Sequence, residues 1–184
     1  NELIQLIQYK PKPPHPPKGG TRRASSDKGG LVYEIPLLII PPWINRYYIL
    51  DLEPHNSFVR FAVEQGFTVF MISWRVPKGD MGKLTFDDYA QSGLLDAVTA
   101  IQEITGQKKV NALGYCIGGT LLGSVAAILA APPPPKGGNN AWDSKNPPLG
   151  GRGAFNTLTF LATMLDFSDF GAMSAVVDLP LVEK

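Results

Sequence analysis

Residues Lys109–Ala131, which read KVNALGYCIGGTLLGSVAAILAA, contain the pattern that decides the fold. The short apolar run Val110–Leu113 predicts a buried strand that leads into a turn. The residues from Thr120 onward are small and apolar with almost no charge, which is typical of a helix covered on most sides. The stretch therefore predicts a strand, a sharp turn and a buried helix in direct succession.

The turn itself matches the G-x-S-x-G pattern of a nucleophile elbow, with Cys116 in the serine position between Gly114 and Gly118. Side chains two residues on either side of such a nucleophile would clash with neighbouring backbone, so glycine is needed at those positions, and Gly119 is assigned to the same steric role. The helix N-terminus favours the thiolate, and the backbone N–H of Ile117 is placed to bind an oxyanion. A buried structural cysteine in an ordinary strand–turn–helix remains the alternative.

Length and composition set bounds on the class of protein. The 184 residues are 44% hydrophobic, which suits one globular domain. A net charge of +1, from 17 basic and 16 acidic residues, gives no indication of a nucleic-acid partner. The single cysteine excludes an internal disulfide and favours a reducing, cytoplasmic compartment. We expect no signal peptide, no transmembrane segment, no metal site and no bound cofactor.

Predicted strands and helices alternate along the rest of the chain. The expected segments are an end of a helix at Asn1–Lys10, strands at Leu31–Ile40, Phe67–Trp74 and Phe155–Leu165, and helices at Asn56–Gln65 and Thr85–Thr105. Two Pro/Gly-rich segments, 11–30 and 132–153, are expected to be irregular. This order predicts a single α/β domain over residues 1–184, with a mostly parallel sheet flanked by helices and an α/β-hydrolase-like elbow.

Four stretches together resemble the poly(3-hydroxyalkanoate) synthases. They are Val32–Leu52 (VYEIPLLIIPPWINRYYILDL), Phe67–Trp74 (FTVFMISW), Gly114–Thr120 (GYCIGGT) and Leu158–Asp169 (LTFLATMLDFSD). The resemblance covers residues 1–10, 31–131 and 154–172, the N-terminal part of that family's catalytic domain. It implies an α/β-hydrolase fold that is incomplete at the C-terminal end.

The resemblance also implies a function. Enzymes of this family are acyltransferases that polymerise (R)-3-hydroxyacyl groups from coenzyme A thioesters, with release of CoA. Cys116 matches the nucleophile, and the backbone N–H groups of Ile117 and Ile44 would be the oxyanion donors. The implied partners are the CoA thioester, the growing polyester chain or granule surface, and a second copy in a homodimer. The implied location is the cytoplasm, at the surface of polyester granules.

One departure from an elbow enzyme is plain, because no histidine follows Cys116 and such enzymes need a general base. The resemblance implies that the acid and the base lie beyond residue 184. His15 and His55 are interpreted as exposed loop residues. Asp166 and Asp169, which follow the last predicted strand, are interpreted as local loop hydrogen-bonding groups.

Two alternatives remain open at this point. The chain could be a catalytically incomplete assembly or granule-surface module that uses exposed apolar faces. It could also be a small thiol hydrolase in which His55 serves as the base for Cys116.

Overall fold

The computed structural model describes residues 1–12, 32–130 and 153–166. Most of the two segments that we expected to be irregular lies outside these residues. His15 and Asp169, which were interpreted from the sequence as loop residues, also lie outside them.

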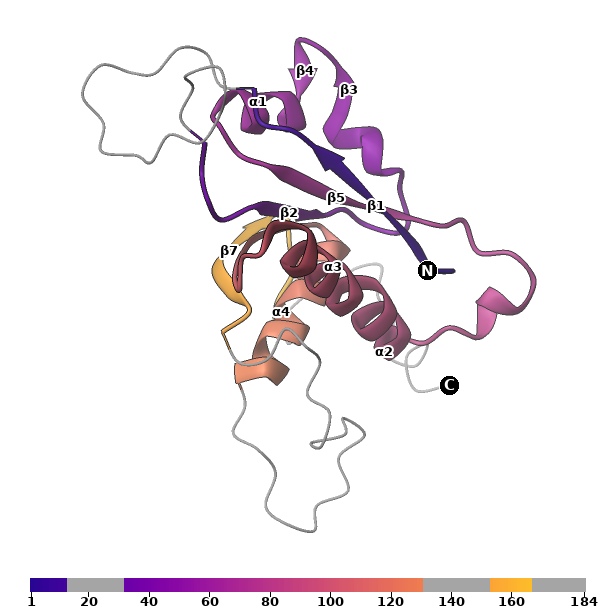
Figure 1. The fold of residues 1–184 in the computed structure, drawn as a ribbon. Coiled ribbons are helices and arrows are strands. Elements are labelled where there is room, and N and C mark those ends of the chain that lie inside the picture. The colour runs from indigo at the N-terminus through magenta and orange to yellow at the C-terminus, as the bar shows by residue number, and fades with distance from the viewer. Residues whose placement is uncertain (13–31, 131–152, 167–184) are drawn as a thin grey trace, which may run out of the picture.

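The described residues form strands and helices in close succession (Figure 1). The strands are β1 (Ile4–Tyr9), β2 (Leu37–Ile40), β3 (Asp51–Glu53), β4 (Asn56–Ser57), β5 (Val69–Trp74), β6 (Val110–Tyr115) and β7 (Phe155–Leu161). The helices are η1 (Tyr47–Leu50), α1 (Phe58–Glu64), η2 (Gly79–Lys83), α2 (Phe86–Asp88), η3 (Tyr89–Leu95), α3 (Asp96–Thr105) and α4 (Ile117–Ala130).

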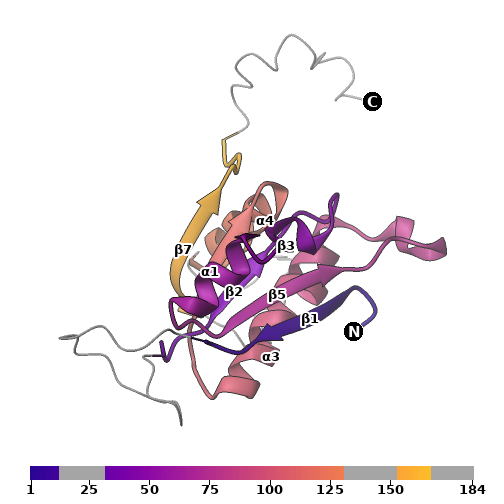
Figure 2. The same cartoon turned by 90° about the horizontal axis from the view of Figure 1, so that it is seen from above.

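Five strands make one sheet in the order β1-β5-β2-β6-β7 (Figure 2). The strands β5, β2, β6 and β7 are parallel, and only β1 pairs antiparallel, at one edge. The helix α1 lies on one face of the sheet, and α3 and α4 lie on the other (Figure 1). A mostly parallel sheet covered by helices, with a strand–turn–helix elbow on an interior strand, confirms the predicted α/β-hydrolase fold.

The central strands are continuously apolar because both faces of the sheet are covered. Leu38 and Phe70 point into the larger core under α3 and α4, whereas Ile39 and Met71 point into the smaller core under α1. All four side chains are fully buried. A slip by one residue would exchange side chains between the two cores, so the packing within each core specifies the register of these strands.

The predicted helix over Thr85–Thr105 is present as one continuous helical stretch, α2–η3–α3. It begins with a capping box between Thr85 and Asp88, and it ends at Gly106, which adopts a left-handed conformation with φ 69°. Its middle part, η3, is a π-helix, and the sequence pattern gave no indication of this widened segment.

The prediction of a helix end at Asn1–Lys10 is wrong. Residues Ile4–Tyr9 form strand β1, which pairs antiparallel with β5 from Ile4 opposite Trp74 to Tyr9 opposite Val69. Gln5 and Gln8 are exposed, as the position of β1 at the edge of the sheet allows. The local apolar pattern did not distinguish the two states, and pairing with the distant β5 decides between them.

Some further boundaries also differ from those expected. Strand β2 begins only at Leu37, because Pro36 lacks the N–H that a ladder needs. Asn56 and Ser57 belong to the small β3–β4 hairpin, so the helix α1 starts two residues later, at Phe58. Strand β7 ends at Leu161 instead of Leu165, because Ala162 turns the chain with a positive φ of 46°.

On the α1 face, the sheet is only partly covered within the described residues. A groove of about 700 Å³ lies there, lined among others by Leu37 on β2, Leu113 on β6 and Thr159 on β7. The seven-residue helix α1 packs against β5 and contributes Val59 and Ala62 to the smaller core. The groove therefore follows from the short span of α1.

Asp88 provides a test of the capping box. Hydrogen bonds from the backbone N–H and then the hydroxyl of Thr85 lower the pKa of Asp88 below its usual range. The carboxylate therefore stabilises the fold above the usual aspartate pKa of about 3.9, and this contribution is lost as the pH falls through the lower folded value. We predict that Asp88→Asn is less stable than the parent at pH 7 and that the difference shrinks below pH 4 in urea unfolding.

Asp87→Asn is the matched control, because Asp87 lies in the same first turn without a recorded bond to Thr85. A stability difference for Asp88→Asn that stays constant from pH 7 to pH 3 would contradict the assignment.

Candidate active site

The site is built around Cys116, which lies between the last residue of β6 and the first residue of α4. Its φ of 55° is in the left-handed region, which is strained for any residue with a side chain. The thiol is free and half-buried. Ile117 is the first residue of α4, so its N–H has no acceptor within the helix. This arrangement has the backbone geometry of a nucleophile elbow.

The glycines around Cys116 allow three pieces of backbone to touch. A Cβ on Gly114 would lie 2.3 Å from the Cα of Gly119, and a Cβ on Gly118 would lie 2.3 Å from the carbonyl oxygen of Ile40. A Cβ on Gly119 would lie 2.0 Å from the hydroxyl oxygen of Thr163. Each of these distances is too short for a real Cβ, so each glycine is sterically required.

The segment after β7 holds the elbow from the other side, and sequence reasoning missed it. The backbone N–H of Cys116 donates to the carbonyl of Leu161 at 2.9 Å. The hydroxyl of Thr120 donates to the carbonyl of Met164 at 2.8 Å. Thr163 covers Gly119, and its hydroxyl donates to Leu161 at 3.0 Å. The sequence offered no signal for these contacts, since 161–165 were expected to continue the strand.

The loop after β2 starts beside the elbow, because Ile40 on β2 pairs with Gly114 on β6. A turn follows, in which the N–H of Asn45 donates to the carbonyl of Pro42 at 3.3 Å. Ile44 lies within this turn, and its side chain is 74% exposed. Its N–H donates to no acceptor within the described residues. A hydrogen-bond donor is therefore available on the loop whose first residues contact the elbow.

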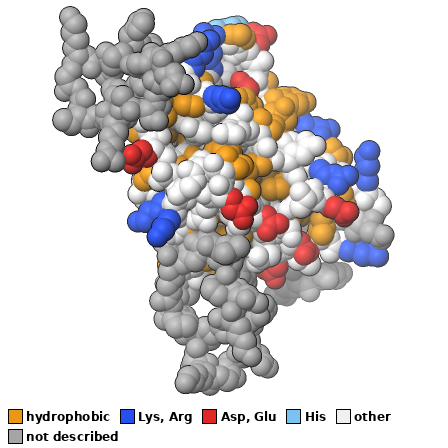
Figure 3. Space-filling model, viewed as in Figure 1, with side chains coloured by type: hydrophobic (Ala, Val, Ile, Leu, Met, Phe, Trp, Pro, Cys, Tyr) orange, Lys and Arg blue, Asp and Glu red, His pale blue; other side chains and the backbone are white. Residues whose placement is uncertain are grey.

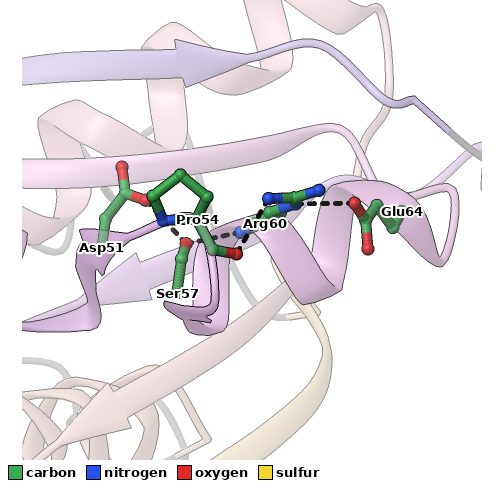
Figure 4. A network of polar contacts seen from close by, with 5 residues as sticks. All are labelled: Asp51, Pro54, Ser57, Arg60 and Glu64. Atoms are coloured by element: carbon green, nitrogen blue, oxygen red, sulfur yellow. Dashed lines mark hydrogen bonds and ion pairs between the residues drawn. The ribbon is translucent and has the colours of Figure 1, made fainter.

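A polar network fixes the far end of this loop (Figure 4). Ser57 donates to Asp51 at 2.6 Å and accepts the backbone N–H of Arg60 at 2.8 Å, which caps α1. The Arg60 side chain donates to the carbonyl of Pro54 at 2.9 Å and pairs with Glu64 at 2.8 Å. The network ties the β3–β4 hairpin to the first turns of α1.

Asp51 also connects this network to the edge of the sheet. The hydroxyl of Tyr9 on β1 donates to Asp51 at 3.2 Å. Burial, together with the neighbouring Asp51 carboxylate, raises the pKa of Tyr9 above its usual range. The phenol therefore remains protonated and remains a donor at neutral pH. The carboxylate accepts from both Tyr9 and Ser57, so β1 and the loop share one anchor.

Two of the titratable residues named from the sequence, His55 and Asp166, lie in the described part of the chain. His55 lies between β3 and β4 with its side chain 80% exposed, and its recorded partner is Glu53 at 3.4 Å. Asp166 is exposed just after β7. Within residues 1–12, 32–130 and 153–166, no cluster of three or more histidine, cysteine or acidic side chains could hold a metal ion. A general base for Cys116 is not identified in this part of the chain.

The visible surface carries basic and acidic side chains interspersed with apolar ones (Figure 3). On this face the two signs of charge are not separated into large patches. Among the helices that the structure describes, none has the length and apolar character needed to span a bilayer.

Comparison with known proteins identifies the family. The family model for the N-terminus of poly-β-hydroxybutyrate polymerase (PhaC) matches residues 24–62. The chain is 40% identical to the poly(3-hydroxyalkanoate) polymerase subunit PhaC of Cupriavidus necator and 38% identical to that of Rhizobium etli, over 97% of its length in both cases. The chain belongs to the poly(3-hydroxyalkanoate) polymerase family. It spans 24% and 23% of the length of those two relatives, about a quarter.

Similarity to solved structures is weaker. A crystal structure of a candidate lipase from Sulfolobus solfataricus overlaps 69% of this chain and 41% of its own, with 17% sequence identity and a TM-score of 0.46. We therefore base the fold assignment on the order of the strands in the sheet and on the elbow, and not on this similarity. Membership of the polymerase family is the firmer finding, because the identity extends along nearly the whole chain.

The elbow glycines give a graded test. The Cβ of Gly114→Ala would meet backbone, which cannot move aside, whereas the Cβ of Gly119→Ala would meet the side chain of Thr163. We predict a loss of about 3 kcal/mol or more in the free energy of unfolding for Gly114→Ala, and about 1–3 kcal/mol for Gly119→Ala, measured by urea denaturation.

Two controls accompany this test. Gly82→Ala should change stability by less than about 0.5 kcal/mol, because a Cβ there meets nothing within 4 Å. Thr163→Ala should recover part of the loss in Gly119→Ala, but none of the loss in Gly114→Ala. Equal costs at Gly82 and Gly114 would contradict the steric account.

Proposed function

We propose that this chain carries the nucleophile of an acyltransferase that polymerises (R)-3-hydroxyacyl groups from coenzyme A thioesters into polyester, with Cys116 as the acylated residue. The supporting observation is the strained φ of 55° at Cys116, between β6 and α4, in a chain that belongs to the polymerase family. Strain at a single residue that carries a nucleophilic side chain is typical of a functional site.

In the first step, the thiolate of Cys116 attacks the carbonyl carbon of the acyl-CoA. A carbon–sulfur bond forms to Cys116, the bond to the CoA sulfur breaks, and CoA leaves as a thiolate that takes up a proton. One thioester is exchanged for another, so the step is nearly balanced in free energy. The acyl group therefore stays reactive on the enzyme.

In the second step, the 3-hydroxyl of a further unit attacks the acyl-cysteine and forms an ester. The sulfur of Cys116 is released, and the hydroxyl proton passes to a general base. No cofactor enters this scheme, since the CoA thioester supplies the activated acyl group. The growing polyester is the product. The proposal includes two further partners, which are the surface of the polyester granule and a second copy of the chain in a homodimer.

We assign the developing oxyanion to two backbone donors. The first is the N–H of Ile117, which has no acceptor within α4. The second is the N–H of Ile44, on the loop that starts against the elbow. Neither donor depends on a side chain, so substitutions that keep the backbone should preserve both.

A second candidate is an assembly or granule-surface role. It is favoured by the groove of about 700 Å³ on the α1 face and by strand β7, most of whose residues are exposed at the edge of the described sheet. The two candidates differ in one measurable respect, because a pure assembly module would release no CoA from the substrate.

Intact-mass spectrometry after incubation with 3-hydroxybutyryl-CoA tests the proposed nucleophile. We predict one added 3-hydroxybutyryl group on the parent protein and none on Cys116→Ala, together with free CoA in the parent sample only. The absence of an adduct, in a protein whose Cys116 is still alkylated by iodoacetamide, would contradict the acyltransferase proposal.

His55→Ala separates the proposal from a thiol hydrolase. His55 is 80% exposed and pairs with Glu53, so we predict that its removal changes the rate of Cys116 acylation by less than about two-fold. The measurement is the time course of adduct mass. A loss of ten-fold or more would indicate that His55 acts as the base and would favour the hydrolase.

A further inference from the structure

We propose that Trp74 is a positioning residue that holds the loop after β2 against the nucleophile elbow, through a hydrogen bond from its indole N–H to the carbonyl of Pro41. This inference rests on the proposed function, because it concerns the loop that carries the second oxyanion donor.

The hydrogen bond is short and buried. Trp74 is the last residue of β5 and is only 8% exposed. Its Nε1 donates to the carbonyl oxygen of Pro41 at 2.7 Å. The next residue, Pro42, has no N–H, so the Pro41–Pro42 peptide can be held only through its carbonyl. The orientation of that peptide at the start of the loop therefore depends on the indole.

The backbone around Pro41 also touches the elbow. A Cβ on Gly118 would lie 2.8 Å from the carbonyl oxygen of Pro41 and 2.3 Å from that of Ile40. Gly118 is two residues after Cys116, in the first turn of α4. The Pro41 carbonyl thus lies between the Trp74 indole and the start of the helix that follows the nucleophile. A shift of this peptide would move the loop relative to Cys116.

The indole is itself held in place by the π-helix η3. A Cβ on Gly93 would lie 2.5 Å from the Cζ3 atom of Trp74, so only glycine admits the ring at this distance. The ring of Tyr89, four residues earlier in η3, lies 5.3 Å from that of Trp74 between centroids. π-Helical segments occur frequently at functional sites. In η3, Gly93 leaves room for the indole of Trp74, and the ring of Tyr89 packs beside it.

The same aromatic cluster reaches the loop from a second direction. Trp43, directly before Ile44, lies 4.8 Å from Tyr89 and 5.9 Å from Trp74 between ring centroids. Trp74 therefore contacts the loop through both a hydrogen bond and a ring. These contacts place the donor of Ile44 relative to strands β5, β2 and β6, which share the rigid sheet.

Trp74→Phe removes the indole N–H and keeps an aromatic ring. We predict a ten-fold or greater fall in the rate of Cys116 acylation by 3-hydroxybutyryl-CoA, with iodoacetamide alkylation of Cys116 within two-fold of the parent. Alkylation needs the thiol but no oxyanion donor, so a structural loss around Cys116 would also move the alkylation rate away from that of the parent. Tyr89→Phe is the matched control, because it removes a polar group from the same cluster and breaks no recorded bond to the loop.

Hydrogen–deuterium exchange gives a readout that does not need activity. We expect faster exchange of the amide of Asn45, which donates to the carbonyl of Pro42, in Trp74→Phe than in the parent or in Tyr89→Phe, with unchanged exchange in α3. If Trp74→Phe does not fold, Gly93→Ala replaces it, since that substitution displaces the ring and keeps the N–H. It should raise exchange in the same loop.

The outcomes separate the two ideas. A parent protein that is never acylated would overturn the proposed function, while loop exchange would still decide the role of Trp74. Parent-like acylation and parent-like loop exchange in a folded Trp74→Phe would overturn the positioning role alone.

Discussion

The absence of side chains at three positions around Cys116 is the constraint on which the rest of the structure depends. At Gly114, Gly118 and Gly119, backbone meets a neighbouring segment at distances that no Cβ could occupy. These contacts bring β6, α4, the end of β2 and the segment after β7 to one point. The strained φ of Cys116 is maintained because every surrounding segment is fixed by such a contact.

This constraint is supported from both faces of the sheet. Successive residues of β2 and β5 alternate between two cores, so a slip by one residue would exchange the side chains of the two cores and disrupt the packing in both. The short strand β2 ends at Ile40. Its pairing with β6 in the buried sheet sets the position at which the following loop begins. Its first carbonyls face the elbow, and its far end is anchored through Asp51.

The site combines a rigid centre with an accessible surface. Cys116 is half-buried, whereas the turn at Ile44 is largely exposed. The β3–β4 hairpin continues the same connection, and His55 at its turn faces solvent beside Glu53. An exposed contact of this kind contributes little to stability.

The sequence by itself determined the α/β class, the central strands and the elbow, because continuous apolar runs and the glycine spacing around Cys116 have few other structural solutions. Local pattern left the state of Ile4–Tyr9 undecided, and pairing with β5 made it a strand. Only the tertiary structure revealed three features: the hydrogen bond from Trp74 to Pro41, the π-helix η3, and the contact of Thr163, in the segment after β7, with Gly119. The two contacts join segments that are far apart in the chain, and the π-helix packs against the distant Trp74. These features depend on the shapes of, and distances between, packed segments, and the local periodicity of apolar residues carries no information about either.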